Sequence, residues 1–352
     1  MKLVHNDRHG AHVPQKEFFR GQLVDAVDRP QRAEQLWAAV RDSGVGQVVA
    51  ARDFGLAPLA RVHSGPYLQF LQGAHAEWLA LGGTGEAFPA VWPVRSLRSD
   101  VEPKNFSGRM GLYSMDNGTP LTAGAWAAAY WGAQATLSGL DSLAAGKADG
   151  AYVLTRPPGH HAGRDFFGGY CFVNHAAVAA QAALDRGAAR VAVLDVDYHH
   201  GNGTQAIFYD RSDVLFVSLH GDPLTEYPFY LGHADERGEG AGLGYNLNLP
   251  LAAGTGNPAW LAALEEGLAC VRSYAPDVLV VSLGLDTSAE DPICSFSLGR
   301  PEFEEVGRRL AALALPTLLV QEGGYAVQAV GAHLLSVLRG FCGQGRQQGA
   351  PK

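Results

Sequence analysis

Charged residues are scarce in this chain, and basic residues do not outnumber acidic ones. Charged side chains make up 18% of the 352 residues, and 27 Lys and Arg face 35 Asp and Glu, which gives a net charge of −8. Because nucleic acids are bound through basic surfaces, this composition argues against a nucleic acid as the main partner. Apolar residues make up 47% of the chain, which excludes a disordered protein.

Cysteine and long apolar runs are also scarce. The four cysteines form no C-x-x-C pair and are too few for a disulfide framework in a chain of this length, which favours reduced thiols. The longest apolar stretch, Val278 to Leu285, is far too short to cross a bilayer. Met1 to Asp7 lacks the apolar core of a signal peptide. We therefore expect a cytoplasmic protein with no membrane partner.

Short apolar runs alternate with Ala- and Leu-rich segments of helical length over most of the chain. Continuous apolar runs are typical of strands that are buried on both faces of a parallel sheet. We predict an α/β fold in a single domain, residues 1–352, with a central, mostly parallel sheet and helices on both faces. The clearest predicted strands are 151–154, 191–194, 214–217, 278–281 and 317–320. The predicted helices are 32–41, 67–81, 122–144, 174–186, 258–274 and 301–313.

One segment interrupts this alternation. Residues 82–120 are rich in Gly and Pro and show neither a helical nor a strand period, although they contain four aromatic residues. A loop of this length inside a compact domain is uncommon and usually has a function. We predict an ordered loop insertion that lines a site or forms an oligomer contact.

Residues with metal-binding chemistry follow two of the predicted strands. The strand that begins at 191 runs into Asp195, Asp197 and His199, which share one face if the chain stays extended. The strand that begins at 278 leads to Asp286, and ligands of open parallel sheets bind at the carboxyl ends of strands. Two carboxylates and an imidazole are costly to bury without a cation. The set suits catalytic zinc or ferrous iron, whereas any one member alone would favour an ordinary solvated turn.

Two further predicted strands lead to candidate catalytic groups. His160 and His161 follow a Pro-Pro-Gly turn, which can aim two adjacent side chains at one site. A neutral histidine can take a proton from a metal-bound water, while a neighbour held by a carboxylate stays cationic. Gly323 and Gly324 precede Tyr325, whose hydroxyl can donate to an oxyanion if the backbone turns into the site.

Together these segments resemble the zinc-dependent deacetylase family of histone deacetylases and acetylpolyamine amidohydrolases, which has the arginase-like α/β fold. The resemblance runs from Arg32 to about Gly340 and rests on several motifs in a fixed order. These are Arg156-Pro-Pro-Gly-His-His161, Gly168-Gly-Tyr-Cys-Phe172, Asp195-Val-Asp-Tyr-His-His-Gly-Asn-Gly203, Val217-Ser-Leu-His-Gly221, Leu283-Gly-Leu-Asp-Thr287 and Glu322-Gly-Gly-Tyr325.

The resemblance implies a role for each matching residue. It makes Asp197, His199 and Asp286 the zinc ligands, and Fe²⁺ is a second option for the metal. It makes His161 the general base and His160 its cationic neighbour. The other implied catalytic residues are Asp195 beside His160, Asn202 beside His161, and Tyr325 at the substrate carbonyl.

The resemblance also implies a structural potassium ion beneath the zinc and a channel for the acyl group. The matching potassium residues are Asp195, Asp197, His199, Ser218 and Leu219, with a second site around Phe208 and Val214. The matching channel residues are Gly169, Tyr170, Tyr227 and Ile293.

Asn202 departs from many histone deacetylases, which carry an Asp at this position. A neutral amide stabilises an imidazolium less than a carboxylate does. We therefore predict that His161 is neutral at pH 7 and acts as the base, whereas His160 is charged.

The chemistry that fits these residues is hydrolysis of an N-acyl amide. The insertion at 82–120 resembles the loop by which acetylpolyamine amidohydrolases form dimers and narrow their channel, so we expect a homodimer and a small acylated amine as substrate. An acyl-lysine protein deacetylase is the main alternative. A catalytically inactive metal-binding regulator would lack a ligand, the base or the tyrosine, and all are present. The His-His pair and the Gly-Gly-Tyr segment argue against an arginase-like dimanganese hydrolase.

Several acidic residues are candidates for contact with a cationic substrate, although a solvated surface charge is the commoner role for each. Cys171 is interpreted as a small buried residue near the site and not as a nucleophile. The acidic candidates are Glu86, Asp100, Glu102, Asp116, Glu290 and Asp291.

Overall fold

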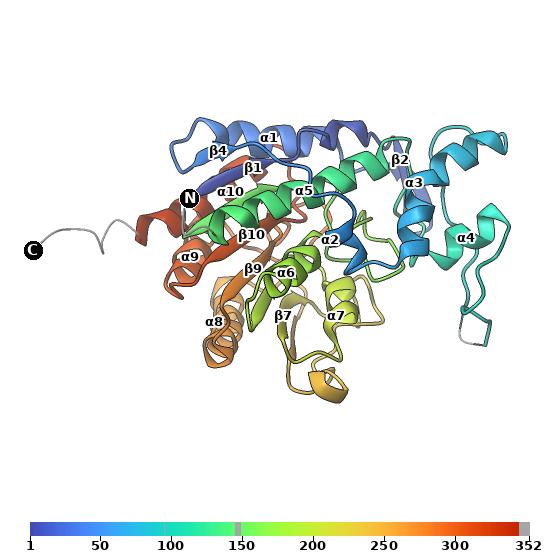
Figure 1. Ribbon diagram of the computed structural model, residues 1–352. Coiled ribbons are helices and arrows are strands. Elements are labelled where there is room, and N and C mark those ends of the chain that lie inside the picture. The colour runs from blue at the N-terminus through green and yellow to red at the C-terminus, as the bar shows by residue number, and fades with distance from the viewer. Residues whose placement is uncertain (95, 145–148, 345–352) are drawn as a thin grey trace, which may run out of the picture.

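Eight parallel strands form the centre of the molecule in the computed structural model, which describes residues 1–94, 96–144 and 149–344 (Figure 1). The order across the sheet is β4-β1-β5-β10-β9-β6-β7-β8, and every pairing is parallel. The predicted parallel α/β fold is thus confirmed. The strands of the sheet are β1 (Lys2–His5), β4 (Gln47–Val49), β5 (Gly150–Leu154), β6 (Val191–Asp195), β7 (Val214–Gly221), β8 (Asn246–Leu251), β9 (Val278–Leu283) and β10 (Thr317–Gln321).

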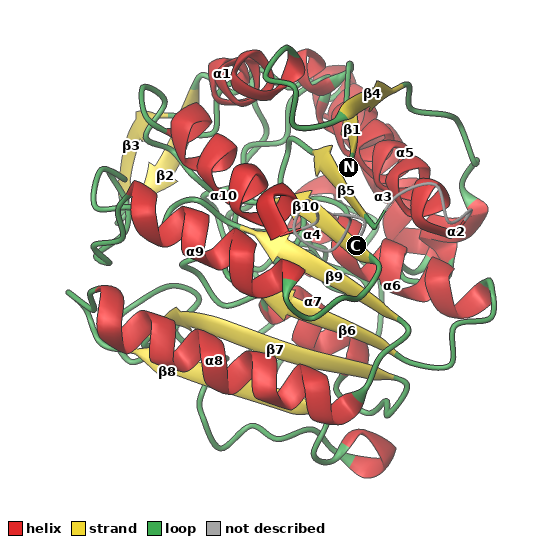
Figure 2. Ribbon diagram, turned by 90° about the vertical axis from the view of Figure 1, so that its left-hand side faces the viewer, coloured by secondary structure: helices red, strands yellow, loops and turns green. Residues whose placement is uncertain are grey.

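Helices cover both faces of the sheet, and Figure 2 shows α8, α9 and α10 on its near side. Alternate residues of a strand enter two different apolar cores. Val191 and Val193 of β6 belong to the core that includes side chains of α5 and α6, whereas Ala192 and Leu194 belong to the core that includes side chains of α8 and α10. Burial on both faces accounts for the continuous apolar runs in the sequence. The helices are α1 (Pro30–Arg41), α2 (Ala57–Ala60), α3 (Gly65–Ala80), α4 (Phe106–Leu112), α5 (Ala125–Ala144), α6 (His175–Asp185), α7 (Asn202–Phe208), α8 (Asn257–Tyr274), α9 (Arg300–Ala311) and α10 (Val330–Gln344), with the 3-10 turns η1 (His9–Ala11) and η2 (Gly240–Gly242).

All of the predicted strands and helices are present, but several elements escaped prediction. β1 and β4 are very short, and β8 carries Asn and Pro, which is typical of an edge strand. α10 contains glycines that weaken its helical pattern. A Cβ at Gly340 would lie 2.0 Å from the carbonyl oxygen of Glu304, so this glycine lets α9 and α10 pack closely. No helix among the described residues is both long and apolar enough to cross a bilayer.

The insertion at 82–120 contains helix α4, which the sequence did not predict. The Asn105 side chain caps α4 by accepting from the backbone N–H of Ser107 at 2.9 Å, and Phe106 packs on Phe70 and Trp78 of α3. Figure 1 places α3 and α4 at the end of the molecule away from both termini. Residue 95 of the insertion lies outside the described residues, as do 145–148 and 345–352 of the predicted domain.

A small antiparallel hairpin stands apart from the main sheet and reaches the same region as the insertion. It consists of β2 (Lys16–Phe19) and β3 (Gln22–Asp25), joined by Arg20 and Gly21, which both have positive φ. The hairpin and the insertion line one cavity together with loops that follow the central strands. The fold therefore brings the chemically distinctive segments to one edge of the sheet.

Candidate active site

Three candidate metal ligands converge where β6 and β9 end. Asp197 and His199 lie in the irregular segment after β6, and Asp286 follows β9, which is the neighbouring strand. One ligand atom from each residue lies within 4.8 Å of the other two. His199 Nδ1 lies 3.2 Å from an Asp286 oxygen and 3.4 Å from an Asp197 oxygen. The sheet thus brings together the three residues that the sequence proposed as a set.

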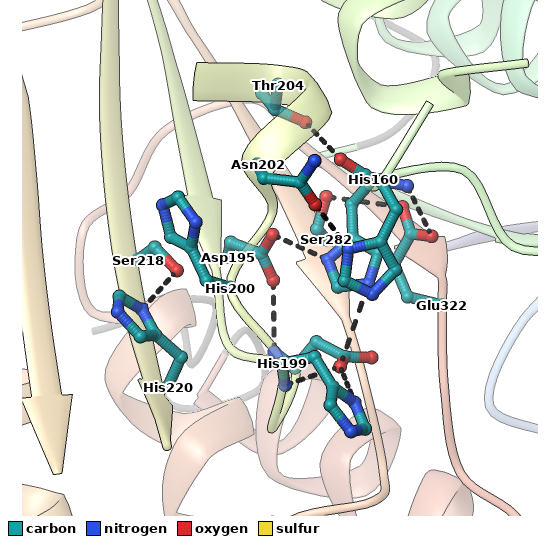
Figure 3. A network of polar contacts seen from close by, with 12 residues as sticks. His160, Asp195, His199, His200, Asn202, Thr204, Ser218, His220, Ser282 and Glu322 are labelled. Atoms are coloured by element: carbon teal, nitrogen blue, oxygen red, sulfur yellow. Dashed lines mark hydrogen bonds and ion pairs between the residues drawn. The ribbon is translucent and has the colours of Figure 1, made fainter. Parts of the chain in front are cut away.

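The prediction that Asp195, Asp197 and His199 share one strand face is wrong in its local geometry. β6 ends at Asp195, and two turns follow, in which Asp195 accepts from the N–H of Asp197 and Asp197 from the N–H of His199. The Asp195 side chain is directed to His160 instead, whose Nδ1 lies 2.9 Å from Oδ2 (Figure 3). Asp197 and His199 meet Asp286, so the segment serves two adjacent groups.

The donor set fits a divalent cation. Asp197 and Asp286 are fully buried, and burial together with the Asp197 charge raises the pKa of Asp286 to about 8. Burial also raises the pKa of Asp197, but the charges of His160 and His199 outweigh it and the net shift is downward. Without a cation, the cluster therefore retains protons that a doubly charged ion would displace. Two carboxylate oxygens and one imidazole nitrogen are ligands that zinc accepts in catalytic sites.

The tandem histidines lie side by side with their ring centroids 4.0 Å apart. His161 donates from Nδ1 to the Asn202 side-chain oxygen at 2.7 Å, whereas His160 is paired with Asp195. Burial lowers the pKa of both rings. For His160 the nearby carboxylates, Asp195 first, outweigh burial and raise the pKa to about 10. The pKa of His161 stays well below 6.5, because the charges of His160 and His199 add to the effect of burial.

Glu322 holds the loop that carries both histidines, a function that the sequence did not indicate. Its carboxylate accepts from the backbone N–H groups of Gly159 at 2.6 Å and His160 at 3.2 Å, and from the Ser282 hydroxyl at 3.3 Å. Figure 3 shows Glu322 next to His160. Glu322 is fully buried, and burial raises its pKa to about 7. Its position directly before Gly-Gly-Tyr was the only available sequence signal.

A cavity of about 710 Å³ opens beside these groups and is lined by His161, His199 and Tyr325 among others. A Cβ at Gly169, which has a φ of +54°, would lie 2.1 Å from the His161 ring, so the close approach there requires glycine. The ring centroids of Tyr170 and Tyr325 lie 5.7 Å apart. The four residues that the resemblance assigned to a channel all lie in the cavity wall: Gly169, Tyr170, Tyr227 and Ile293.

Asp116 is the one acidic candidate from the sequence that lines this cavity. It accepts from the Tyr227 hydroxyl at 2.6 Å and from the N–H of Gly169 at 2.7 Å. The other candidates lie outside the cavity wall as described; Asp100, for example, pairs with Arg98 on the surface, and Asp291 accepts from the N–H of Tyr325. The other three are Glu86, Glu102 and Glu290.

Two carboxylates near the cavity were not predicted from the sequence. Glu226 lines the cavity beside Tyr227. Glu17 of β2 is only 2% exposed and accepts from the Tyr170 hydroxyl at 3.0 Å. Its pKa is raised to about 7, chiefly by burial. Glu17 belongs to no motif, and the only sequence signal was the Arg20-Gly21 turn that follows it in the chain.

The residues matched to potassium sites lie in two places. Ser218 is opposite Asp195 in the β6–β7 register, and its hydroxyl lies 2.8 Å from His220 Nδ1. Leu219 follows on the same strand, so this group adjoins the candidate metal ligands through Asp195. Phe208 ends α7 and Val214 begins β7, and both are buried.

A parallel sheet with helices on both faces, and with carboxylates and imidazoles at its carboxyl ends, has the architecture of the arginase-deacetylase fold. The chain belongs to the histone deacetylase family, because the histone deacetylase domain model matches residues 26–341. Acetylpolyamine amidohydrolase 1 of Pseudomonas aeruginosa is 52% identical over 98% of this chain and 100% of that protein. The acetylpolyamine amidohydrolase of Mycoplana ramosa is 44% identical over 97% and 100%. A crystal structure of an acetylpolyamine aminohydrolase from Burkholderia pseudomallei matches with a TM-score of 0.92 and 41% identity, covering 97% of this chain and 98% of that chain.

Proposed function

We propose that the protein is a metal-dependent amidohydrolase that removes acetyl groups from acetylated polyamines or similar small cationic amides. The observation that carries this proposal is the convergence of Asp197, His199 and Asp286 with His161 and Tyr325 around one cavity. The relatives named acetylpolyamine amidohydrolases, which align with nearly the whole chain, support the reaction and the substrate class.

The metal in this proposal is Zn²⁺, with Fe²⁺ as the second option, held by Asp197, His199 and Asp286. When bound, such an ion supplies Lewis acidity toward an amide carbonyl and acidifies a water molecule. The chain orients the two carboxylates through backbone donors, since the N–H of Gly323 donates to Asp197 at 2.8 Å and the N–H of Tyr198 donates to Asp286 at 2.9 Å. Such outer hydrogen bonds fix ligand orientation and tune affinity.

His161 is the general base in this proposal. Because its Nδ1 donates to Asn202, its Nε2 carries the free lone pair that can accept a proton from the attacking water. His160, which is held cationic by Asp195, places positive charge beside the negative charge that develops in the transition state. The proton that His161 accepts is then available for the leaving amine.

Tyr325 donates from its hydroxyl to the substrate oxygen as the carbonyl becomes tetrahedral. Its backbone N–H donates to Asp291 at 2.6 Å, and the Arg32 guanidinium lies 5.2 Å from the centre of its ring. The left-handed conformation of Gly324, with a φ of +120°, allows the turn that directs Tyr325 into the cavity. Burial raises the pKa of the tyrosine, so it remains a proton donor at neutral pH.

The cavity suits an amine with a positive charge at some distance from the acyl group. Asp116 and Glu226 line it, and Glu17 accepts from the hydroxyl of Tyr170. Tyr170 and Tyr227 present aromatic surface to a methylene chain or an ammonium group. A cationic polyamine thus finds carboxylates and ring faces beyond the reacting amide.

The proposal also includes a structural potassium ion near Asp195, Ser218 and Leu219, and a second one near Phe208 and Val214. The support for the first ion is that the buried carboxylate of Asp195 lies opposite the Ser218 hydroxyl in the strand register. Removal of potassium is expected to lower the melting temperature of the metal-loaded protein. Location in the cytoplasm is part of the proposal as well, because Cys171, Cys270 and Cys294 are free thiols.

Self-association through the insertion at 82–120 is the final part of the proposal. Four of its apolar side chains are exposed: Val91, Val94, Leu97 and Val101. A second copy of the chain is the occupant that we propose for this surface, since association would remove these side chains from water. Light scattering after size exclusion should give a dimer, and Val94→Asp with Leu97→Asp should give a monomer. A monomeric unaltered protein would contradict this part.

The experiment that tests the activity is a turnover panel on protein reconstituted with Zn²⁺ or with Fe²⁺. N-acetylputrescine, N-acetylcadaverine and an acetyl-lysine peptide are compared by kcat/KM. The proposal expects the two acetylated diamines to be preferred. Preference for the peptide would favour a protein deacetylase, and absence of turnover with either metal would contradict an enzymatic function.

A further inference from the structure

A second group of potential metal ligands lies behind the tandem histidines. One ring nitrogen of His160, the sulfur of Cys171 and a carboxylate oxygen of Glu322 all lie within 4.8 Å of one another. The three residues are at most 2% exposed. His160 and Cys171 lie in the connection between β5 and α6, and the fold brings Glu322 to them from the loop after β10. The hydrolytic function proposed above uses neither Cys171 nor a sulfur ligand.

The chemistry of this group suits zinc and similar divalent cations. Thiolate sulfur, imidazole nitrogen and carboxylate oxygen are the three ligand types that zinc takes from proteins. Ligand atoms around tetrahedral zinc lie roughly 3.3–3.8 Å apart, so the side chains need to close in by at most about 1.5 Å. The contacts that such a cation would compete with are weak on the sulfur side, where the Cys171 thiol donates to the Gly169 carbonyl at 3.2 Å.

The site adjoins the cavity. The carbonyl of Gly169 accepts from the Cys171 thiol, and Gly169 also lines the cavity. The second group of ligands therefore lies directly behind the cavity wall. The Glu322 carboxylate is already oriented toward His160 by the N–H groups of Gly159 and His160 and by the Ser282 hydroxyl (Figure 3). Metal binding would replace the thiol proton of Cys171 and a ring proton of His160.

We propose that His160, Cys171 and Glu322 form a second, inhibitory site for a thiophilic divalent cation such as Zn²⁺. An ion on His160 competes with Asp195 for the ring, and His160 Nε2 lies only 3.7 Å from an Asp197 oxygen. A doubly charged ion this close to Asp197 draws His160 out of its place beside the reaction centre and repels the catalytic metal, so turnover falls. Inhibition rests on the proposed function, whereas binding at this site does not.

Cobalt(II) distinguishes the two sites because only the second contains sulfur. The metal-free protein is titrated with Co²⁺, and the near-ultraviolet sulfur-to-cobalt charge-transfer absorption is recorded together with turnover of N-acetylputrescine. The first equivalent is expected to restore turnover without this absorption, and further Co²⁺ is expected to produce the absorption while turnover falls. Cys171→Ser should lose the absorption but still bind the first equivalent.

Cys294→Ser is the matched control, because Cys294 is a half-buried thiol that donates to the Ser288 carbonyl near Asp286. It should keep the absorption. Absence of the absorption from the unaltered protein, or its loss in Cys294→Ser but not in Cys171→Ser, would overturn the site. Absorption without a fall in turnover would overturn its inhibitory role. Failure of the first equivalent to restore turnover would instead count against the proposed function.

A measurement without any variant guards against misfolding of Cys171→Ser. X-ray absorption of the unaltered protein with one equivalent of Zn²⁺ should show only nitrogen and oxygen neighbours. With an excess of Zn²⁺, a sulfur neighbour at about 2.3 Å should appear. If zinc has only nitrogen and oxygen neighbours in both samples, the second site is contradicted.

Discussion

His161 donates from Nδ1 to the side-chain oxygen of Asn202 at 2.7 Å, and this contact defines which ring nitrogen faces the cavity. The Asn202 amide is itself held in this orientation, because its nitrogen lies 3.2 Å from the sulfur of Met115. The partner of His161 is therefore neutral, whereas the partner of His160 is the carboxylate of Asp195. The pKa values of the two adjacent histidines accordingly shift in opposite directions, because the Asp195 carboxylate outweighs burial at His160 and no carboxylate pairs with His161 Nδ1.

Asn202→Asp should make His161 easier to protonate. A carboxylate at hydrogen-bond distance raises the pKa of an imidazole by about 1–3 units, because it stabilises the charged ring. His161 must be neutral to act as a base. The rise of kcat with pH on the acid side of the pH profile should therefore move to higher pH. The profile is measured with N-acetylputrescine over the range of about pH 5 to 9. An unchanged rise on the acid side would show that the titration of His161 does not control turnover.

Tyr325→Phe should lower kcat by about 10²–10³-fold, because it removes one donor to the developing oxyanion. The ring contacts with Tyr170 and Arg32 survive this substitution, so the fold should be retained. KM should change little, since the hydroxyl acts mainly in the transition state. Steady-state kinetics with thermal melting as the folding control test this expectation. A rise in KM alone would instead indicate a ground-state binding function.

Asp286→Asn should abolish stabilisation by the catalytic metal. A ligand present at about a thousand times its Kd adds about 4 kcal/mol to the free energy of unfolding, and removal of one ligand should eliminate most of this gain. The melting temperature of the metal-free protein should rise by several degrees with Zn²⁺, and that of Asp286→Asn should not. The matched control is Asp277→Asn, an exposed carboxylate that caps the N–H groups of Ala189 and Arg190 away from the site. An equal response in both variants would exclude Asp286 as a ligand.

Much of the candidate site was predictable because its residues follow buried strands. Each apolar run identified a strand, and parallel strands deliver the residues after their carboxyl ends to one edge, so Asp197 and Asp286 could be associated without a structure. The local path of the chain was not predictable in the same way. Period-two alternation fails after Asp195 because β6 ends there and side chain–backbone turns take over.

The functions of residues that act through distant contacts were not predicted from the sequence. Glu322 holds the histidine loop through backbone N–H groups that any residue could offer, so no residue pattern marks the interaction. Glu17 reaches Tyr170 only because the β2–β3 hairpin folds over the cavity. Such pairings depend on tertiary packing, which overrides local propensity.

Glu17 is a buried carboxylate whose ionisation costs stability. Burial is the largest cause of its raised pKa of about 7, against an ordinary value of 4.5. Between these values the folded protein holds a proton that the unfolded chain has released, so stability falls as pH rises through this window. The cost at about pH 8 is at most about 3.5 kcal/mol, since one pKa unit corresponds to about 1.4 kcal/mol. A charge kept at this cost beside Tyr170 is consistent with recognition of a cation.

Glu17→Gln should therefore raise the melting temperature at pH 8 and weaken substrate binding. The amide preserves the shape of the side chain: its oxygen can accept from the N–H of Val27, and its NH2 group can donate to the Tyr170 hydroxyl, which donates to the carboxylate in the unaltered protein. KM for N-acetylputrescine should rise by about tenfold, in line with the loss of one interaction with a charged group. In the unaltered protein KM should fall as pH rises through 7, and this dependence should disappear in the variant. Asp25→Asn, at an exposed carboxylate of the same hairpin, is the matched control and should change neither KM nor its pH dependence. A higher melting temperature with unchanged KM would leave Glu17 a buried charge without a function in substrate recognition.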